Sequence, residues 1–280
     1  MLTKLKTTEV ARRALTARQR FGFPLDSPCD VYELISKYGL ALRFTNISTL
    51  DGLYLNDGLL GSINVSTLRP SGHQRFTAAH ELGHFLLGHG AHLDEKIENM
   101  ESDSTEEEMA DTFARHLLMP KRAALRGFRS LGVTPATANP EQYYAVASWL
   151  GVGYTTLVQH TRWTLGLIDS PQLHRLTLKT PQQIKRKQVP SVSWSGRKEL
   201  WPFAGWWDGT NVHLQIGDVV TGLTSPSLDH FDIGDACAIA TSVGQLSAQV
   251  YGGATVHLNI SKTDYVGMYQ YRYLEEPVDA

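Results

Sequence analysis

The sequence predicts an α+β protein: a mainly helical first part with a small β-sheet, then a helix-turn-helix-like segment and a β-rich last part. Two observations predict this class. Apolar residues recur at helical spacing over much of residues 3–168, interrupted by extended stretches between 40 and 65. From about residue 193 the pattern changes to short alternating runs that are typical of strands.

Composition narrows the class of protein. Of the 280 residues, 42% are hydrophobic and 19% are charged, which suits a soluble chain of about two domains. The net charge of −2 argues against a polyanion-binding surface over the whole molecule. Two cysteines do not make a disulfide framework, and no apolar run or leader of the signal type is present. We therefore expect a cytoplasmic protein with no membrane span.

The first elements follow from apolar spacing and breakers. Residues 3–21 have an amphipathic helical pattern, and a second helix is expected to begin near Asp30. Three strands should follow, and a turn at 56–58 should join the last two: Leu40 to Phe44, Leu53 to Leu55 and Leu59 to Val65.

Two helices and a helix-turn-helix-like segment are expected next. The first helix should stop near Gly88. Another should run over 106–119, with acidic residues in its first turn and Pro120 at its end. The segment Tyr143 to Ile168 predicts two helices joined by a turn at 150–153. The later strands are predicted at 212–216, 236–242, 247–251, 255–260 and 265–273.

The helix before Gly88 contains the sequence His80-Glu81-x-x-His84. Each helical residue advances about 100°, so the two histidines lie only about 40° apart, and Glu81 lies on the same side. Two imidazoles one turn apart bind one tetrahedral zinc, and the carboxylate between them accepts a proton from the attacking water. A chance match on a half-buried helix is the alternative reading of these five residues alone.

A catalytic zinc needs a third protein ligand. A third histidine in the three-histidine arrangement would fall at position 90, which is Gly90, and His89 is one residue early. The remaining source is the acidic start of the helix at 106–119.

Helical phase separates the three glutamates there. Glu107 lies at the margin of the inward apolar stripe, with Asp111 one turn further on. Glu106 has an alanine as its i+4 partner, and Glu108 points outward. We therefore predict Glu107 as the third ligand and Asp111 as the carboxylate that holds a zinc-bound histidine through its other ring nitrogen. The alternative is that these glutamates only cap a helix.

These motifs together resemble the ImmA/IrrE family of zinc metallopeptidases. The resemblance covers about residues 20–170, and the residues that carry it are the run 75–87, Glu107, Ala110-Asp111, Phe113-Ala114 and the run 117–120, with upstream matches at 30–31, 38–40 and 61–65.

The resemblance implies a zincin-like peptidase core over residues 1–125 that binds Zn²⁺ through His80, His84 and Glu107, with Glu81 as the general base. The strand Leu60 to Val65 would be the edge along which an extended peptide substrate pairs. It also implies a helix-turn-helix-like segment over 126–170, packed on the core. The sequence pattern predicts a basic linker at 171–192 and a β-rich sensor or substrate-binding domain at 193–280.

Members of this family cut helix-turn-helix transcriptional repressors, often beside mobile elements or stress and defence genes. The resemblance therefore implies a zinc-dependent endopeptidase that cleaves a specific repressor of this kind. Such cleavage would act as a derepression switch in a stress, mobile-element or phage-defence response. The alternative is a DNA-binding or toxin–antitoxin regulator whose metal site is structural or vestigial.

Three further hypotheses concern one basic segment and several single residues. Residues 121–200 hold twelve Lys or Arg against three Asp or Glu, which makes contact with DNA or another nucleic acid plausible. Cys29, next to a helix start, is a candidate inhibitory thiolate for the zinc. Candidate donors to the oxyanion of the transition state are Tyr143, Tyr144, Tyr154 and His160.

Overall fold

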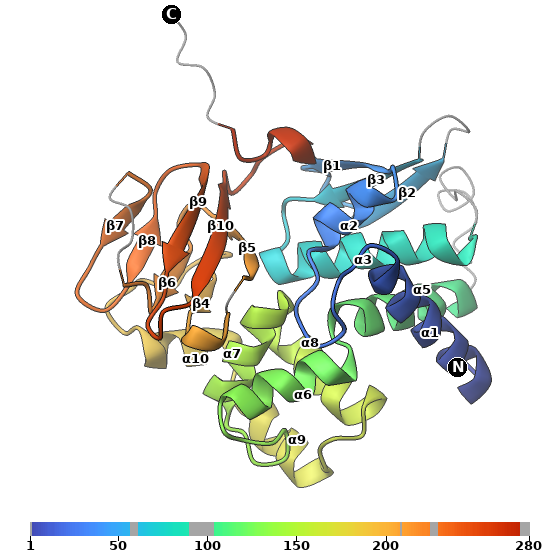
Figure 1. Ribbon diagram of the computed structural model, residues 1–280, viewed down its shortest axis with the longest axis horizontal. Coiled ribbons are helices and arrows are strands. Elements are labelled where there is room, and N and C mark those ends of the chain that lie inside the picture. Colours follow the sequence, from blue (N-terminus) through green and yellow to red (C-terminus); the bar gives the residue numbers. More distant parts are fainter. Residues whose placement is uncertain (1, 57–60, 90–103, 208, 225–228, 275–280) are drawn as a thin grey trace, which may run out of the picture. The chain divides into compact units, whose positions relative to one another are not determined.

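The computed structural model describes residues 2–56, 61–89, 104–207, 209–224 and 229–274. The chain divides into two compact units, Met1–Arg126 with Val266–Tyr269, and Gly127–Tyr265 with Gln270–Ala280. Helices and small sheets occur in both, so the predicted α+β class is confirmed (Figure 1). The turn predicted after Asn56 and position 90 lie outside the described residues.

The first unit begins with two capped helices. Helix α1 (Lys4–Arg20) starts after Thr3, whose hydroxyl accepts from the backbone N–H of Lys6. Helix α2 (Val31–Lys37) starts after Asp30, whose carboxylate accepts from the backbone N–H groups of Tyr32 and Glu33. Both helices lie where the sequence predicts them.

The small sheet of the first unit has the strand order β11-β1-β3-β2. Its strands are β1 (Ala41–Thr45), β2 (Gly52–Asn56), β3 (Gly61–Ser66) and β11 (Gly267–Met268). Strand β3 pairs in parallel with β1 and antiparallel with β2. The prediction that Leu60 to Val65 forms an edge is therefore wrong: β3 is paired on both sides, and β2 is the edge strand at that end of the sheet. A local pattern does not reveal which strands flank a given strand.

Two helices carry the predicted metal residues and pack closely on each other. Helix α3 (Ser71–Leu87) ends at Gly88, as predicted, and α5 (Ser104–Leu118) ends before Pro120. Figure 1 shows α3 between the sheet and α5. Gly83 permits this approach: a Cβ there would lie 3.3 Å from Cα of Ala110 and 3.1 Å from the Phe113 ring. The two helix backbones are therefore close enough for side chains on both to meet.

Helix α6 (Lys121–Ser130) runs across the boundary between the units. The second unit contains the helix-turn-helix-like segment, which consists of α7 (Pro140–Leu150), α8 (Tyr154–Gln159) and a π-helical turn (His160–Thr164). Gly151 ends α7 with a φ of 72°, which a glycine adopts without strain. Residues 171–192, expected as a basic linker, instead contain most of α9 (Ser170–Thr177) and all of α10 (Pro181–Gln188). Both helices begin with a capping side chain and a proline in the first turn, a start signal that basic composition concealed.

Two further sheets complete the second unit, with strand orders β5-β10-β9 and β4-β6-β8-β7. Their strands are β4 (Leu200–Pro202), β5 (Asn211–Gln215), β6 (Val219–Thr221), β7 (Phe231–Ile233), β8 (Ala238–Ala240), β9 (Gly244–Gln249) and β10 (Thr255–Ser261). The strand predicted at 265–273 is wrong in extent and in place. It is reduced to β11, which pairs with β1 in the first unit, and a 3-10 turn (Tyr269–Tyr271) follows it.

The helices of the second unit pack on its strands. The hydroxyl of Tyr144 in α7 donates to the carboxylate of Glu199 and accepts from the N–H of Leu200 in β4. The indoles of Trp149 and Trp206 meet edge to face, 5.0 Å apart. These contacts make the helix-turn-helix-like segment part of the same unit as the β-rich residues. No helix among the described residues is long and apolar enough to span a membrane.

Candidate metal centre

Three predicted metal ligands meet where α3 and α5 pack together. Nε2 of His80 lies 3.0 Å from Nε2 of His84 and 3.2 Å from Oε2 of Glu107. Nε2 of His84 lies 3.6 Å from Oε1 of Glu107. The three residues each offer one ligand atom within 4.8 Å of the other two. The structure thus brings together the side chains that helical phase selected from the two helices.

This donor set fits a small divalent cation. At Zn–N and Zn–O distances of roughly 2.1 Å, tetrahedral geometry places neighbouring ligand atoms about 3.4 Å apart. The three separations of 3.0, 3.2 and 3.6 Å fall around that value. Two imidazoles and one carboxylate are also the donors of a catalytic zinc site, which keeps its fourth position open. The two histidines are well shielded, with 7% of the His84 side chain and 16% of the His80 side chain exposed, whereas that of Glu107 is 34% exposed.

Asp111 holds the outer nitrogen of His80. Its Oδ1 lies 3.0 Å from Nδ1 of His80, and its Oδ2 accepts from Arg115 at 3.4 Å. Burial raises the pKa of Asp111, but the hydrogen bonds and charges of His80 and Arg115 together outweigh burial, so the pKa is lowered overall. Asp111 therefore stays ionised and orients His80 with Nε2 toward the other two ligand atoms.

The same contacts predict a pH dependence for metal binding. Burial lowers the pKa of His80, but its hydrogen bonds to Asp111 and Glu107 and the charges of Glu81 and Asp111 together outweigh burial and raise the pKa from 6.5 to about 9. In the metal-free fold, protonated His80 is therefore stabilising below 6.5, and this contribution is lost as the pH rises through about 9. Metal binding has the opposite sign, since Nε2 must be deprotonated to bind. We expect zinc affinity to rise by about tenfold per pH unit until pH reaches about 9.

Competition with a chelator of known pH dependence measures this rise. The Asp111→Asn variant removes the carboxylate that raises the pKa of His80, so its affinity should level off at a lower pH. An affinity that is flat between pH 7 and pH 9 in the wild-type protein would contradict the prediction.

Glu81 points toward strand β2. A Cβ built on Gly52 would lie 3.0 Å from Oε1 of Glu81 and 2.2 Å from the γ-methyl of Thr77. Only a residue without a side chain lets the strand approach α3 this closely. The carboxylate predicted as general base thus lies beside the edge strand of the sheet, and Gly52 is a residue that sequence reasoning missed.

Residues 36–155, which include all three candidate ligands and Glu81, match the IrrE N-terminal-like domain, Peptidase_M78. The match covers less than half of the chain, and the likeness to this family is that of the segment. The predicted relationship to ImmA/IrrE metallopeptidases is confirmed by this match.

No curated protein matches the chain. One solved structure, described as a Mycobacterium tuberculosis transcriptional regulator, is similar at 14% identity and a TM-score of 0.35. The similar part covers 55% of this chain and 46% of the regulator, so the chain spans less than half of that structure's length. A likeness at this level carries no conclusion about function.

Cys29 does not have the properties of an inhibitory thiolate. It lies N-terminal to the Peptidase_M78 segment, and it is buried. Burial raises the pKa of its thiol to about 12, despite the nearby charge of Arg18. The thiol is therefore protonated at neutral pH, and it is not part of the three-ligand group.

The candidate oxyanion donors are engaged inside the second unit. The hydroxyl of Tyr143 donates to the Pro135 carbonyl, and that of Tyr154 to the Leu176 carbonyl. Tyr144 donates to Glu199, and His160 is fully buried. These hydrogen bonds give the three tyrosines partners within their own unit, where His160 is buried, and a role for any of the four as an oxyanion donor stays a prediction.

Proposed function

We propose that this chain is a zinc-dependent metalloendopeptidase that cleaves a specific helix-turn-helix transcriptional repressor. The observation that supports the proposal most is the convergence of His80, His84 and Glu107 within 4.8 Å, with Glu81 next to the first ligand in a segment of a peptidase family. Zinc is the metal that the donor set favours, since two imidazoles and a carboxylate suit it better than oxygen-seeking cations.

Each side chain then has a defined task. His80, His84 and Glu107 would hold the zinc, which supplies Lewis-acid polarisation of the scissile carbonyl and lowers the pKa of a water toward about 7. Glu81 would accept the proton of the attacking water and transfer it to the leaving amine. Asp111 would keep His80 in the orientation for binding.

An extended substrate fits the edge of the small sheet. Among the described strands, β2 pairs only with β3, so it is an edge strand to which an extended peptide could add. Gly52 at the start of β2 lies against Glu81, so a peptide paired with β2 would run past the general base. This assigns the peptide-binding role to β2 rather than to the strand expected from the resemblance.

The repressor substrate follows from the ImmA/IrrE resemblance. Such a protease would act in the cytoplasm as a derepression switch in a stress, mobile-element or phage-defence response. The alternative, a DNA-binding or toxin–antitoxin regulator with a structural or vestigial metal site, has weaker support. Part of the basic excess at 121–200 is used internally: Lys185 donates to the Lys198 carbonyl, and Lys187 pairs with Glu141.

Mapping new protein N-termini by mass spectrometry tests the proposal. The wild-type chain and the Glu81→Gln variant are expressed in the same host and compared. We expect new N-termini inside a helix-turn-helix protein with the wild-type chain only. Cleavage of that purified protein should stop with a zinc chelator and return with added zinc. Equal N-termini with both chains, together with an unchanged cellular effect, would favour the regulator instead.

A further inference from the structure

We propose that His89 is a positioning residue for the metal centre, which accepts a hydrogen bond from His84 and holds that ligand in its metal-binding tautomer. The inference rests on the proposed metal site. Nδ1 of His89 lies 3.0 Å from Nδ1 of His84, and the two rings meet edge to face with centroids 5.0 Å apart. His89 itself is 7% exposed.

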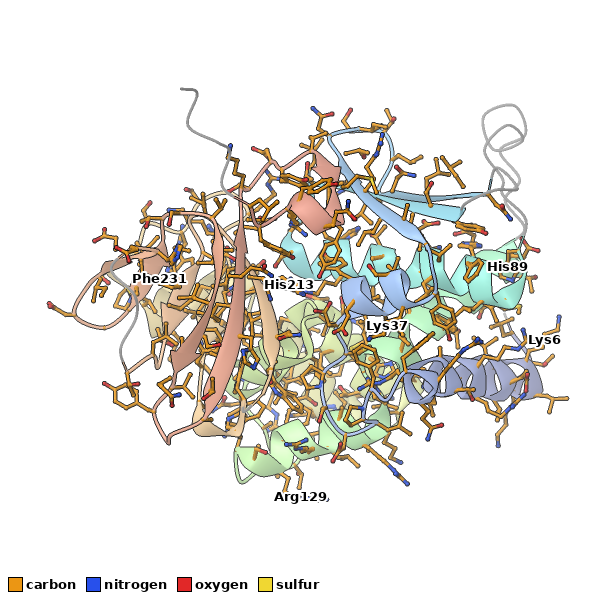
Figure 2. The ribbon with its side chains drawn as sticks, turned by 45° about the horizontal axis from the view of Figure 1, so that its top comes forward. Lys6, Lys37, His89, Arg129, His213 and Phe231 are labelled. Carbon is orange, nitrogen blue, oxygen red and sulfur yellow. The ribbon has the colours of Figure 1, made fainter. Side chains whose placement is uncertain are left out.

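The end of α3 places His89 there. Gly88 adopts a left-handed conformation with a φ of 78°, which turns the chain back onto the helix. The N–H of His89 then donates to the carbonyl of His84 at 3.0 Å, and the N–H of Gly88 donates to that of Phe85. Figure 2 labels His89 at this end of α3. A continued helix would instead carry residue 89 about 140° around the axis from His84.

Accounting for protons gives each ring a defined tautomer. Nε2 of His84 faces Nε2 of His80 and the Glu107 carboxylate, so a bound metal needs the lone pair of that atom. Neutral His84 then carries its proton on Nδ1, so this atom acts as a hydrogen-bond donor and not as an acceptor. Nδ1 of His89 lies at hydrogen-bond distance, so it is the acceptor and the proton of His89 is on Nε2.

The two histidine ligands therefore have different partners. Asp111 supplies an anionic oxygen to His80, and His89 supplies a neutral imidazole nitrogen to His84. Each partner fixes the ring orientation of its ligand, which is the general role of groups behind metal-binding histidines. A neutral partner does so without a further negative charge beside Glu107 and Asp111. His89 is not a ligand itself, because the three-ligand group among the described residues excludes it.

A matched pair of variants tests the role. In His89→Asn the amide Oδ1 takes about the place of Nδ1 and can accept the hydrogen bond, whereas His89→Phe keeps a ring without an acceptor. We expect His89→Phe to bind zinc about 10–100-fold more weakly than the wild-type protein, and His89→Asn to recover most of the loss. His116→Phe is the control, because this half-buried histidine lies nine residues from Glu107, about 180° around α5.

Chelator competition measures zinc affinity, and thermal unfolding of the metal-free proteins measures stability. Weaker zinc binding by His89→Phe at an unchanged metal-free melting temperature supports positioning. Wild-type affinity in His89→Phe, or an equal loss in His89→Phe and His89→Asn, overturns it. If the wild-type protein itself binds no zinc, the proposed function fails instead.

A spectroscopic measurement keeps the inference testable if the phenylalanine variant does not fold. In the zinc-loaded wild-type protein with ¹⁵N-labelled histidine, NMR should find a proton on Nδ1 of His84 and on Nε2 of His89. A proton on Nδ1 of His89 would overturn the proposal, since that atom could not then accept.

Discussion

The Glu81→Gln variant is expected to lose cleavage of its substrate protein by about 10²–10⁴-fold, the usual contribution of a general base. Glutamine has nearly the shape of glutamate but cannot accept the proton of the attacking water. The change leaves His80, His84 and Glu107 in place, so zinc affinity should stay close to that of the wild-type protein. If Glu81→Gln loses turnover but still binds zinc, Glu81 acts in proton transfer and not in metal binding.

Initial cleavage rates and chelator competition measure the two quantities on the same preparations. Glu33→Gln is a matched control, since it removes one negative charge from α2, where Glu33 pairs with Lys37 at 3.1 Å. This control should cleave at the wild-type rate. Full activity in Glu81→Gln would contradict both the role of this carboxylate and the peptidase mechanism.

The Arg18→Met variant is expected to lower the free energy of unfolding of the metal-free protein by about 2–4 kcal/mol. Arg18 has no exposed surface, and its guanidinium donates to the carbonyls of Leu117, Ser27 and Pro24. Methionine fills a similar volume but donates nothing, so these carbonyls lose their charged partner. The substitution also removes a buried positive charge. Burial disfavours that charge, as the lowered pKa of Arg18 shows, so its removal offsets part of the lost free energy of unfolding.

Denaturant unfolding measures this change, and Arg12→Met is its control. The Arg12 side chain is 68% exposed and pairs with Glu9 at 2.8 Å, so its loss should cost less than about 0.5 kcal/mol. Equal stabilities of the two variants would show that the Arg18 contacts contribute nothing. A loss at Arg18 should also weaken zinc binding, since its contact with Leu117 joins α1 to the helix that carries Glu107.

Local patterns predicted much of the first unit. Helices α1 and α3 and the start of α2 follow from apolar spacing, caps and the glycine at position 88. Sequence patterns predicted less of the structure after residue 169. Basic composition suggested a linker there, but the structure has the helices α9 and α10. The run 265–273 failed for another reason: its strand belongs to a sheet whose other strands lie more than 200 residues earlier in the sequence.

By itself, the sequence determined the candidate ligands, because the i, i+4 spacing of His80 and His84 and the phase of Glu107 are properties of single helices. Only the tertiary structure decided how those ligands meet, through the contact of Gly83 with Ala110, and which strand is the edge beside Glu81. It also decided the partner of His84, because a left-handed turn at Gly88 brings His89 back to the helix. Each of these depends on which segments pack together, and a local repeat of 2 or 3.6 residues carries no information about that.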